Sequence, residues 1–162
     1  MKIDVRSVDL IVLDFDGVLT DNFVYIDQNG TESVKCSRSD GLAFDILRKT
    51  NVKVIILSTE TNKVVKERAR KLKVDAFNSK DNKEAFLKQY CLENSYSLER
   101  VLFIGNDLND YEAMKISGYS LCPVDSHPEI IKIASWVIGV EGGKGVIRYL
   151  VESILDLNFL KE

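Results

Sequence analysis

Two aspartates one residue apart are the residues of this chain best suited to chemistry. Asp14 and Asp16 directly follow the apolar run 10–13 and precede a glycine. Side chains at positions i and i+2 of a strand point to the same side, so the two carboxylates are expected side by side. Neighbouring carboxylates raise each other's pKa, and Mg²⁺, a cation that prefers oxygen ligands, removes that cost. The pair therefore predicts half of a metal site, although Asp and Gly also begin ordinary turns.

Three more polar segments follow at comparable places further along the chain. Ser58 comes at the end of the apolar run 52–57. Lys83 stands at a predicted helix start, and the polar segment 106–110 follows the run 101–104. Each has an ordinary interpretation: Ser58 as a helix cap, Lys83 as a solvated lysine, and 106–110 as a polar turn. Their order (acidic loop, hydroxyl, lysine, acidic loop) is much harder to explain as coincidence.

This set suits phosphoryl transfer through an aspartyl-phosphate. A carboxylate is a competent covalent nucleophile, so Asp14 would attack phosphorus while Mg²⁺ neutralises the phosphoryl oxygens. Asp16 would protonate the leaving alkoxide and then take a proton from the hydrolytic water. Ser58 and Lys83 would hold the phosphoryl oxygens as charge develops. Because enzymes accelerate phosphate monoester hydrolysis by up to ~10²¹, a full constellation rather than one residue is expected.

The elements that must position these residues alternate along the chain. Apolar runs predict parallel strands buried on both faces, over residues 10–13, 52–57, 101–104, 136–138 and, more weakly, 119–124. Helices are predicted over 41–49, 62–72, 83–92, 110–117, 128–134 and 146–155, with Asp40 capping the first and Thr61 the second. This alternation indicates an α/β, doubly wound, Rossmann-like parallel sheet. Ligands bind such sheets beyond the carboxyl ends of the strands, which is where the polar residues fall.

A β-hairpin is predicted over residues 23–36, directly after the first acidic loop. The pair Asn29-Gly30 between two β-rich runs is the strongest short-range signal for a hairpin. An isolated hairpin is only marginally stable. We therefore expect the apolar residues Phe23, Tyr25 and Ile26 to pack on a neighbouring subunit, with packing on the parent sheet as the alternative.

The composition limits the classes of function. The 162 residues fit one domain over 1–162, and the net charge of −3 argues against a nucleic-acid partner. No apolar stretch is long enough to span a membrane, and the first residues lack the hydrophobic region of a signal peptide. Three scattered cysteines are not at zinc spacing. A cytoplasmic protein is expected.

With these residues in place, the chain resembles the haloacid dehalogenase superfamily of phosphatases. The resembling motifs are residues 14–21, Ser58, Lys83 and 105–110, and the resemblance extends over nearly the whole chain. More narrowly, the chain is similar to a small branch with a hairpin insertion and no large cap. That branch contains 3-deoxy-manno-octulosonate 8-phosphate phosphatases, nonulosonate 9-phosphate phosphatases and the C-terminal domains of some acylneuraminate cytidylyltransferases. The narrower likeness rests on residues 16–21, the hairpin, and the segments 125–128 and 142–148.

The resemblance implies a magnesium site and a homotetramer assembled through the hairpins. Mg²⁺ would be held by the Asp14 side chain, the Asp16 backbone carbonyl and Asn106. Phosphatases of this branch usually have Asp in place of Asn106, so this site loses a charge and its affinity for Mg²⁺ should fall. Asp107 or Asp110 could compensate, directly or through water.

Substrate contacts are expected at positions where the chain departs from the octulosonate enzymes. Those enzymes resemble Thr-Gly-Arg where this chain has Ser58-Thr59-Glu60, and they tend to carry Arg where it has Ser39. The glycine run 142–145 could cradle a phosphate or form a tight turn. The residues predicted to bind substrate are Thr59, Glu60, Ser39, Gly143 and Lys144. Glu60 is similar to the nine-carbon enzymes, which favours a nonulosonate 9-phosphate over an octulosonate 8-phosphate.

Two other functions are weighed against a sugar-acid phosphatase. A weakly active or inactive oligomerisation domain, related to the cytidylyltransferase-associated form, is kept open by Asn106. A phospho-accepting receiver also combines an acidic pocket with a lysine on a doubly wound sheet. It fits less well, because Asp16 is positioned to drive a hydrolysis that a receiver does not need.

Overall fold

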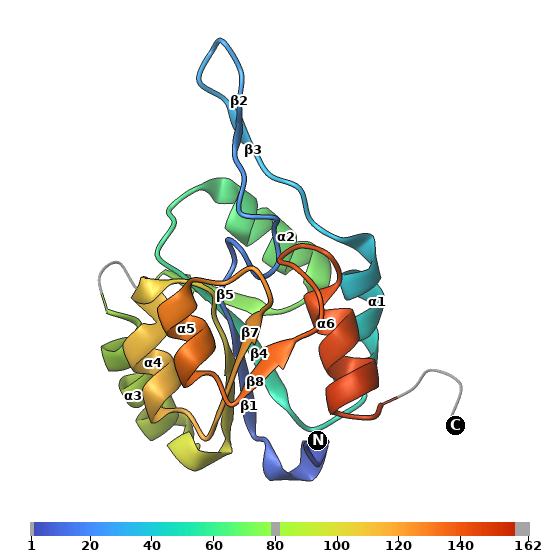
Figure 1. Ribbon diagram of the computed structural model, residues 1–162, viewed down its shortest axis with the longest axis vertical. Helices are drawn as coiled ribbons and strands as arrows, with labels where there is room; N and C mark the ends of the chain where they lie inside the picture. The colour runs from blue at the N-terminus through green and yellow to red at the C-terminus, as the bar shows by residue number, and fades with distance from the viewer. Residues whose placement is uncertain (1, 79–81, 158–162) are drawn as a thin grey trace.

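The centre of the molecule is a six-stranded parallel sheet in the order β5-β4-β1-β6-β7-β8 (Figure 1). The structure is a computed structural model and describes residues 2–78 and 82–157. The strands are β1 (Leu10–Leu13), β4 (Lys53–Ser58), β5 (Asp75–Asn78), β6 (Val101–Ile104), β7 (Tyr119–Pro123) and β8 (Trp136–Ile138). The predicted doubly wound α/β class is therefore confirmed.

Strand β1 lies at the point where the strand order reverses. It pairs with β4 on one side and with β6 on the other, so that Leu13 stands opposite both Ile56 and Ile104. The chain moves from β1 outward to β5 and then crosses back to β6 and outward to β8. In open α/β sheets this switch point is the usual ligand site. The residues that follow β1, β4 and β6 consequently meet at one edge.

Helices cover both faces of the sheet (Figure 1). One face carries α1 (Arg38–Leu47), α2 (Lys63–Leu72) and α6 (Val146–Tyr149), the last continued by a π-helical turn over Leu150–Ile154. The other face carries α3 (Lys83–Asn94), α4 (Tyr111–Ile116) and α5 (Pro128–Ile133). Short 3₁₀ turns occur at Val5–Ser7, Leu98–Arg100 and Leu108–Asp110. Each face buries its own apolar cluster, as expected for strands without polar alternation.

Two predicted helix caps are wrong. The first helix begins earlier than expected, capped by Ser37, whose hydroxyl accepts from the backbone N–H of Ser39. Asp40 therefore lies inside α1. The second helix is capped by Asn62 rather than Thr61, through a hydrogen bond from the N–H of Val64.

The hairpin forms as predicted and projects from the carboxyl edge of the sheet (Figure 1). Strands β2 (Tyr25–Ile26) and β3 (Glu32–Ser33) pair antiparallel in a separate two-stranded sheet. Phe23 and Ile26 are 70% and 67% exposed, so they do not pack on the parent sheet. Among the described residues, no helix has the length and hydrophobicity needed to cross a membrane.

Candidate active site

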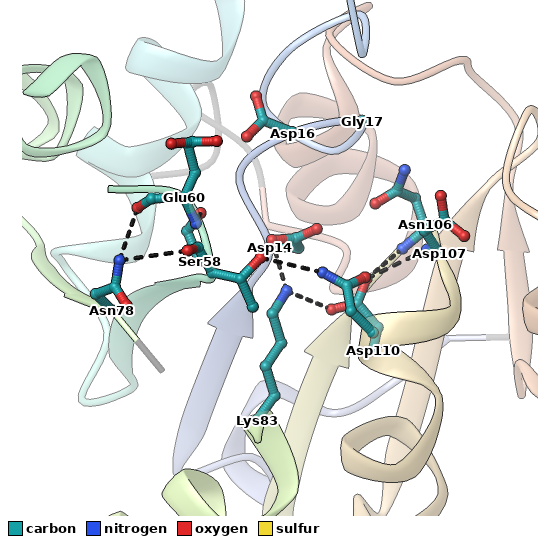
Figure 2. Close-up of polar contacts among 12 residues, drawn as sticks. Asp14, Asp16, Gly17, Ser58, Glu60, Asn78, Lys83, Asn106, Asp107 and Asp110 are labelled. Carbon is teal, nitrogen blue, oxygen red and sulfur yellow. Dashed lines mark hydrogen bonds and ion pairs between the residues drawn. The ribbon is translucent and has the colours of Figure 1, made fainter. Parts of the chain in front are cut away.

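The predicted catalytic side chains converge beyond the carboxyl ends of β1, β4 and β6 (Figure 2). Asp14 follows β1, Ser58 ends β4, Lys83 is the first residue of α3, and Asn106 comes shortly after β6. Asp14, Ser58 and Asn106 line a cavity of about 340 Å³, whereas Lys83 contacts Asp14 without lining the cavity itself. Its lining residues are Asp14, Asp16, Asn22, Ser58, Thr59, Asn106, Asp107 and Asn109.

A buried lysine lies between two buried carboxylates at the base of this cavity. Lys83 Nζ is 2.7 Å from Asp14 Oδ1 and 2.6 Å from Asp110 Oδ1. All three side chains are almost completely excluded from solvent. Burial alone would lower the pKa of Lys83, but the charges of Asp14 and Asp110 outweigh it and raise that pKa. Lys83 is therefore a fixed cation.

The second oxygen of Asp110 organises the acidic loop. Asp110 Oδ2 accepts from the backbone N–H of Asn106 at 2.8 Å and from that of Asp107 at 3.3 Å. Both oxygens of Asp110 are thus engaged by the protein. The Asp107 side chain instead accepts from the N–H of Leu108 at 2.7 Å and borders the cavity.

Asp14 needs positive charge to stay ionised. Burial, followed by the charge of Asp110, raises the pKa of Asp14 to about 7, against the lowering effect of Lys83. A carboxylate must be ionised to act as a nucleophile. A divalent cation on its free side would favour the ionised form.

Three groups converge at the free side of Asp14, and they fit a hard cation. The end of the Asn106 side chain lies 2.8 Å from the backbone oxygen of Asp16 and 3.1 Å from Asp14 Oδ2. Adjacent oxygen ligands of an octahedral Mg²⁺ are about 2.9 Å apart. No group of three or more His, Cys, Asp and Glu side chains suited to a metal occurs in the described part of the chain. The three groups that converge here are therefore one carboxylate, one amide and one backbone oxygen.

Asp16 stands at the cavity with a different environment from Asp14. Partial burial, followed by the charge of Glu60, raises the pKa of Asp16. The Thr20 hydroxyl lies 3.4 Å from Asp16 Oδ1 and accepts from the backbone N–H groups of Gly17 and Asn22. Thr20 thereby connects the two ends of the loop over residues 14–22, which we call the catalytic loop. This role was not predicted from the sequence, although Thr20 lies only four residues after Asp16.

The segment after β4 is held by its own hydrogen bonds. Ser58 Oγ accepts from the N–H of Glu60 at 3.0 Å. Glu60 Oε1 accepts from the N–H groups of Thr61 and Asn62, so its carboxylate supports the start of α2. Thr59 lines the main cavity, whereas Glu60 lines a neighbouring one of about 200 Å³.

The glycine run 142–145 lies against the catalytic loop, and we call this run the strap. The N–H of Gly143 donates to the Val18 carbonyl at 3.0 Å, and that of Lys144 donates to Glu141. These donors are used internally, which favours the tight turn over the phosphate cradle. Ser39 Oγ, in α1, bonds to the hydroxyl of its neighbour Ser37. None of Ser39, Gly143 and Lys144 lines the 340 Å³ cavity.

Two asparagines that the sequence analysis did not single out also line the cavity. Asn22 adopts a left-handed backbone conformation at the end of the first acidic loop, and Asn109 lies on the second. Asn109 Nδ2 lies 3.5 Å from the Thr59 hydroxyl. Asparagine is common in turns, so neither residue carried a distinct signal.

A larger cavity, of about 500 Å³, lies at the opposite end of the strands. Three of its four charged lining residues are in ion pairs: Arg48 with Asp45, and Lys53 with Asp75 at 2.6 Å, the fourth being Lys73. Ligands of open α/β sheets bind at the other end. The smaller cavity is therefore the candidate active site.

The fold and this site define the class of protein. The haloacid dehalogenase-like hydrolase family matches residues 45–150, more than half of the chain, so the chain belongs to this family. It is 29% identical over 151 residues to 3-deoxy-D-manno-octulosonate 8-phosphate phosphatase KdsC of Salmonella typhi, covering 93% of this chain and 80% of that protein.

Solved structures agree with this assignment. A Streptomyces avermitilis protein described as a HAD family hydrolase superposes with a TM-score of 0.92 at 41% identity, covering 96% of this chain and 89% of that one. The 3-deoxy-D-manno-octulosonate 8-phosphate phosphatase of Yersinia pestis superposes with a TM-score of 0.86 at 26% identity, covering 91% and 80%.

Proposed function

We propose that this protein is a magnesium-dependent phosphatase that hydrolyses a sugar-acid phosphate through an aspartyl-phosphate on Asp14. The observation that carries the proposal is that the two oxygens of the Asp14 carboxylate have different partners. One oxygen is held by Lys83, and the other faces the amide of Asn106, which also lies against the backbone oxygen of Asp16. The family and the KdsC relatives support the same class of reaction.

In the first half-reaction, Asp14 attacks phosphorus and the ester P–O bond breaks. Asp16, which lines the same cavity and is not paired with Lys83, gives its proton to the leaving alkoxide. Lys83 and the Ser58 hydroxyl stabilise the phosphoryl oxygens.

In the second half-reaction, water attacks phosphorus and Asp16 takes its proton. The bond between phosphorus and Asp14 breaks, which releases inorganic phosphate and restores the carboxylate. Asp110 remains beneath the site, where its two oxygens hold Lys83 and the acidic loop.

Mg²⁺ would be held by Asp14, the Asp16 backbone oxygen and Asn106, with Asp107 near enough to the cavity to act through water. When bound, the ion supplies positive charge that neutralises the carboxylate and the phosphoryl oxygens. Because both oxygens of Asp110 are engaged, we assign it to positioning Lys83 rather than to the ion.

The substrate we favour is a nonulosonate 9-phosphate, with an octulosonate 8-phosphate as the alternative. Glu60 and Ser39 stand where the octulosonate enzymes tend to carry basic residues. Thr59 and the cavity asparagines offer hydrogen bonds to a polyhydroxylated chain. We also propose a cytoplasmic location, where the free thiols of Cys36, Cys91 and Cys122 would remain reduced.

The test is phosphate release from a panel of octulosonate 8-phosphate and nonulosonate 9-phosphates, with and without Mg²⁺. Turnover that disappears in Asp14→Asn would establish the phosphatase and identify its substrate. Absence of turnover with every sugar acid, in folded protein supplied with Mg²⁺, would contradict the proposal for these substrates. It would favour the oligomerisation domain instead.

A further inference from the structure

The side chain of Asn106 can be placed in two orientations that differ only in which end atom faces the catalytic loop. That atom lies 2.8 Å from the backbone oxygen of Asp16 and 3.1 Å from Asp14 Oδ2. Asn106 itself is buried. The two orientations exchange an acceptor for a donor at the same place.

With the amide oxygen in this position, three acceptors face one another with no hydrogen between them, and the NH₂ group at the other end faces only donors. Such an arrangement is repulsive unless a cation lies among the oxygens. This is the orientation that suits the proposed magnesium site, and the inference rests on that part of the proposed function.

With the amide nitrogen in this position, Asn106 donates to both Asp16 O and Asp14 Oδ2 at the same two distances. Both separations are within hydrogen-bonding range. The amide then satisfies the two oxygens that the cation would otherwise bind. An ionised aspartate at position 106 accepts only, and it could not make either bond.

We propose that Asn106 is a two-state amide switch. In the metal-free protein its NH₂ group bridges Asp14 and the Asp16 backbone, and binding of Mg²⁺ turns the amide by half a rotation to present its oxygen. The cation must displace two hydrogen bonds, and it gains a neutral ligand in place of a carboxylate. Asn106 therefore stabilises the empty site and weakens its affinity for the metal.

The Asn106 amide packs directly against the backbone at Gly17. A Cβ atom on Gly17 would lie 2.0 Å from Asn106 Nδ2 and 3.1 Å from Oδ1. Gly17 also has a φ of +81°, a conformation that favours glycine. The absence of a side chain at Gly17 is thus what allows the amide to lie against the loop.

The direct test is NMR on the ¹⁵N-labelled wild-type protein during a titration with Mg²⁺. The Asn106 NH₂ signals, assigned by their loss in Asn106→Asp, should show hydrogen bonding and slow exchange without metal. Both properties should be lost as Mg²⁺ binds. Identical shifts and exchange rates in the two states would overturn the switch, whether or not the protein hydrolyses any phosphate.

A second test compares Mg²⁺ affinity by calorimetry in wild type, Asn106→Asp and Asn109→Asp. The last is a matched control that adds the same charge to the same loop, at a side chain 3.5 Å from the Thr59 hydroxyl. Asn106→Asp should bind Mg²⁺ at least about tenfold more tightly, because ligand charge governs affinity, and Asn109→Asp less than about threefold. Asn106→Asp should also melt at a lower temperature without metal and show the larger Mg²⁺-induced rise. Equal affinities, or an unchanged metal-free melting temperature, would contradict the proposal.

Discussion

At the scale of single residues, the site is organised by one buried cation shared between two carboxylates. Lys83 contacts the proposed nucleophile Asp14 and the loop-organising Asp110 at nearly equal distances. Removing one member of a buried ion pair leaves an uncompensated charge, which is strongly destabilising. We therefore expect the proposed catalysis and the stability of the fold to be coupled in these three residues.

This coupling predicts that replacing Asp110 by asparagine destabilises the protein, whereas the same change at Asp107 does not. Asp110→Asn should destabilise the protein by about 1–3 kcal/mol, because an amide cannot accept with both ends: either Lys83 keeps Asp14 as its one partner, or the loop N–H groups are left unpaired. Turnover should fall with it. Asp107→Asn should be nearly neutral for stability, since Asn caps the following turn about as well as Asp. Urea denaturation and phosphate release measure both variants, and equal losses of stability would contradict the assigned roles.

At the scale of elements, the sequence predicted the buried strands better than the helix ends. Strands β1, β6 and β8 have the predicted bounds, because each is an uninterrupted apolar run. Strand β5 was missed, since it is a partly exposed edge strand with polar residues at both ends. The cap assigned to Asp40 failed because its partners lie 107 and 108 residues away, in α6. The pairing of Lys83 with Asp110 could not be predicted for the same reason, because the two residues are 27 positions apart and meet only in the folded chain.

The link between α1 and α6 predicts a pH-dependent stability. Asp40 Oδ1 accepts from the N–H groups of Ile147 and Arg148, while burial raises the pKa of Asp40 against those bonds and the charge of Arg68. A raised folded pKa means that folded Asp40 holds its proton more tightly than unfolded Asp40. The resulting stability is present below the unfolded pKa of about 3.9 and is lost as the pH rises through the folded value.

Asp40→Asn retains an acceptor but cannot ionise. The stability of the wild type relative to Asp40→Asn should fall from pH 4 upward and level off above the folded pKa, by about 1.4 kcal/mol per unit of raised pKa. Urea denaturation of both proteins across this range measures the difference. A difference that does not change with pH would show that Asp40 titrates alike in the folded and unfolded chains.

Replacement by alanine should have opposite effects on stability at two glycines, one in the strap over the catalytic loop and one in α1. Gly143 has a φ of +67°, and a Cβ there would lie 2.6 Å from the backbone of Thr20 and Asp21. Gly143→Ala should therefore cost about 2 kcal/mol or more and displace the catalytic loop, lowering turnover. Gly41→Ala, inside α1 where a Cβ meets nothing within 4 Å, should stabilise by about 0.5–1 kcal/mol. Thermal denaturation of the two variants would contradict the argument if Gly143→Ala were neutral.

At the scale of the whole molecule, an exposed apolar segment lies on the same side as the candidate site. Phe23, Val24, Tyr25 and Ile26 are 70%, 51%, 55% and 67% exposed, on a hairpin beyond the carboxyl edge of the sheet (Figure 1). Contiguous exposed apolar residues commonly mark protein–protein interfaces. No large cap covers the cavity in the part of the chain that the structure describes, so a neighbouring subunit is the natural element to close it. The exposed residues support an interface between subunits, for which we propose the homotetramer that the family resemblance implies.

The proposed assembly predicts that the hairpin can be changed without unfolding the sheet. The double variant Phe23→Ser with Ile26→Ser should sediment at a lower mass than the wild-type tetramer and keep its secondary structure, because the hairpin contributes nothing to either buried cluster at these positions. Turnover should fall, since each cavity would lose the neighbour that closes it. Leu92→Ser, at a residue 76% exposed on α3, is the matched control and should leave the mass unchanged. A wild-type protein that sediments as a monomer would contradict the proposed tetramer. A double variant that stays tetrameric would show that the interface lies elsewhere.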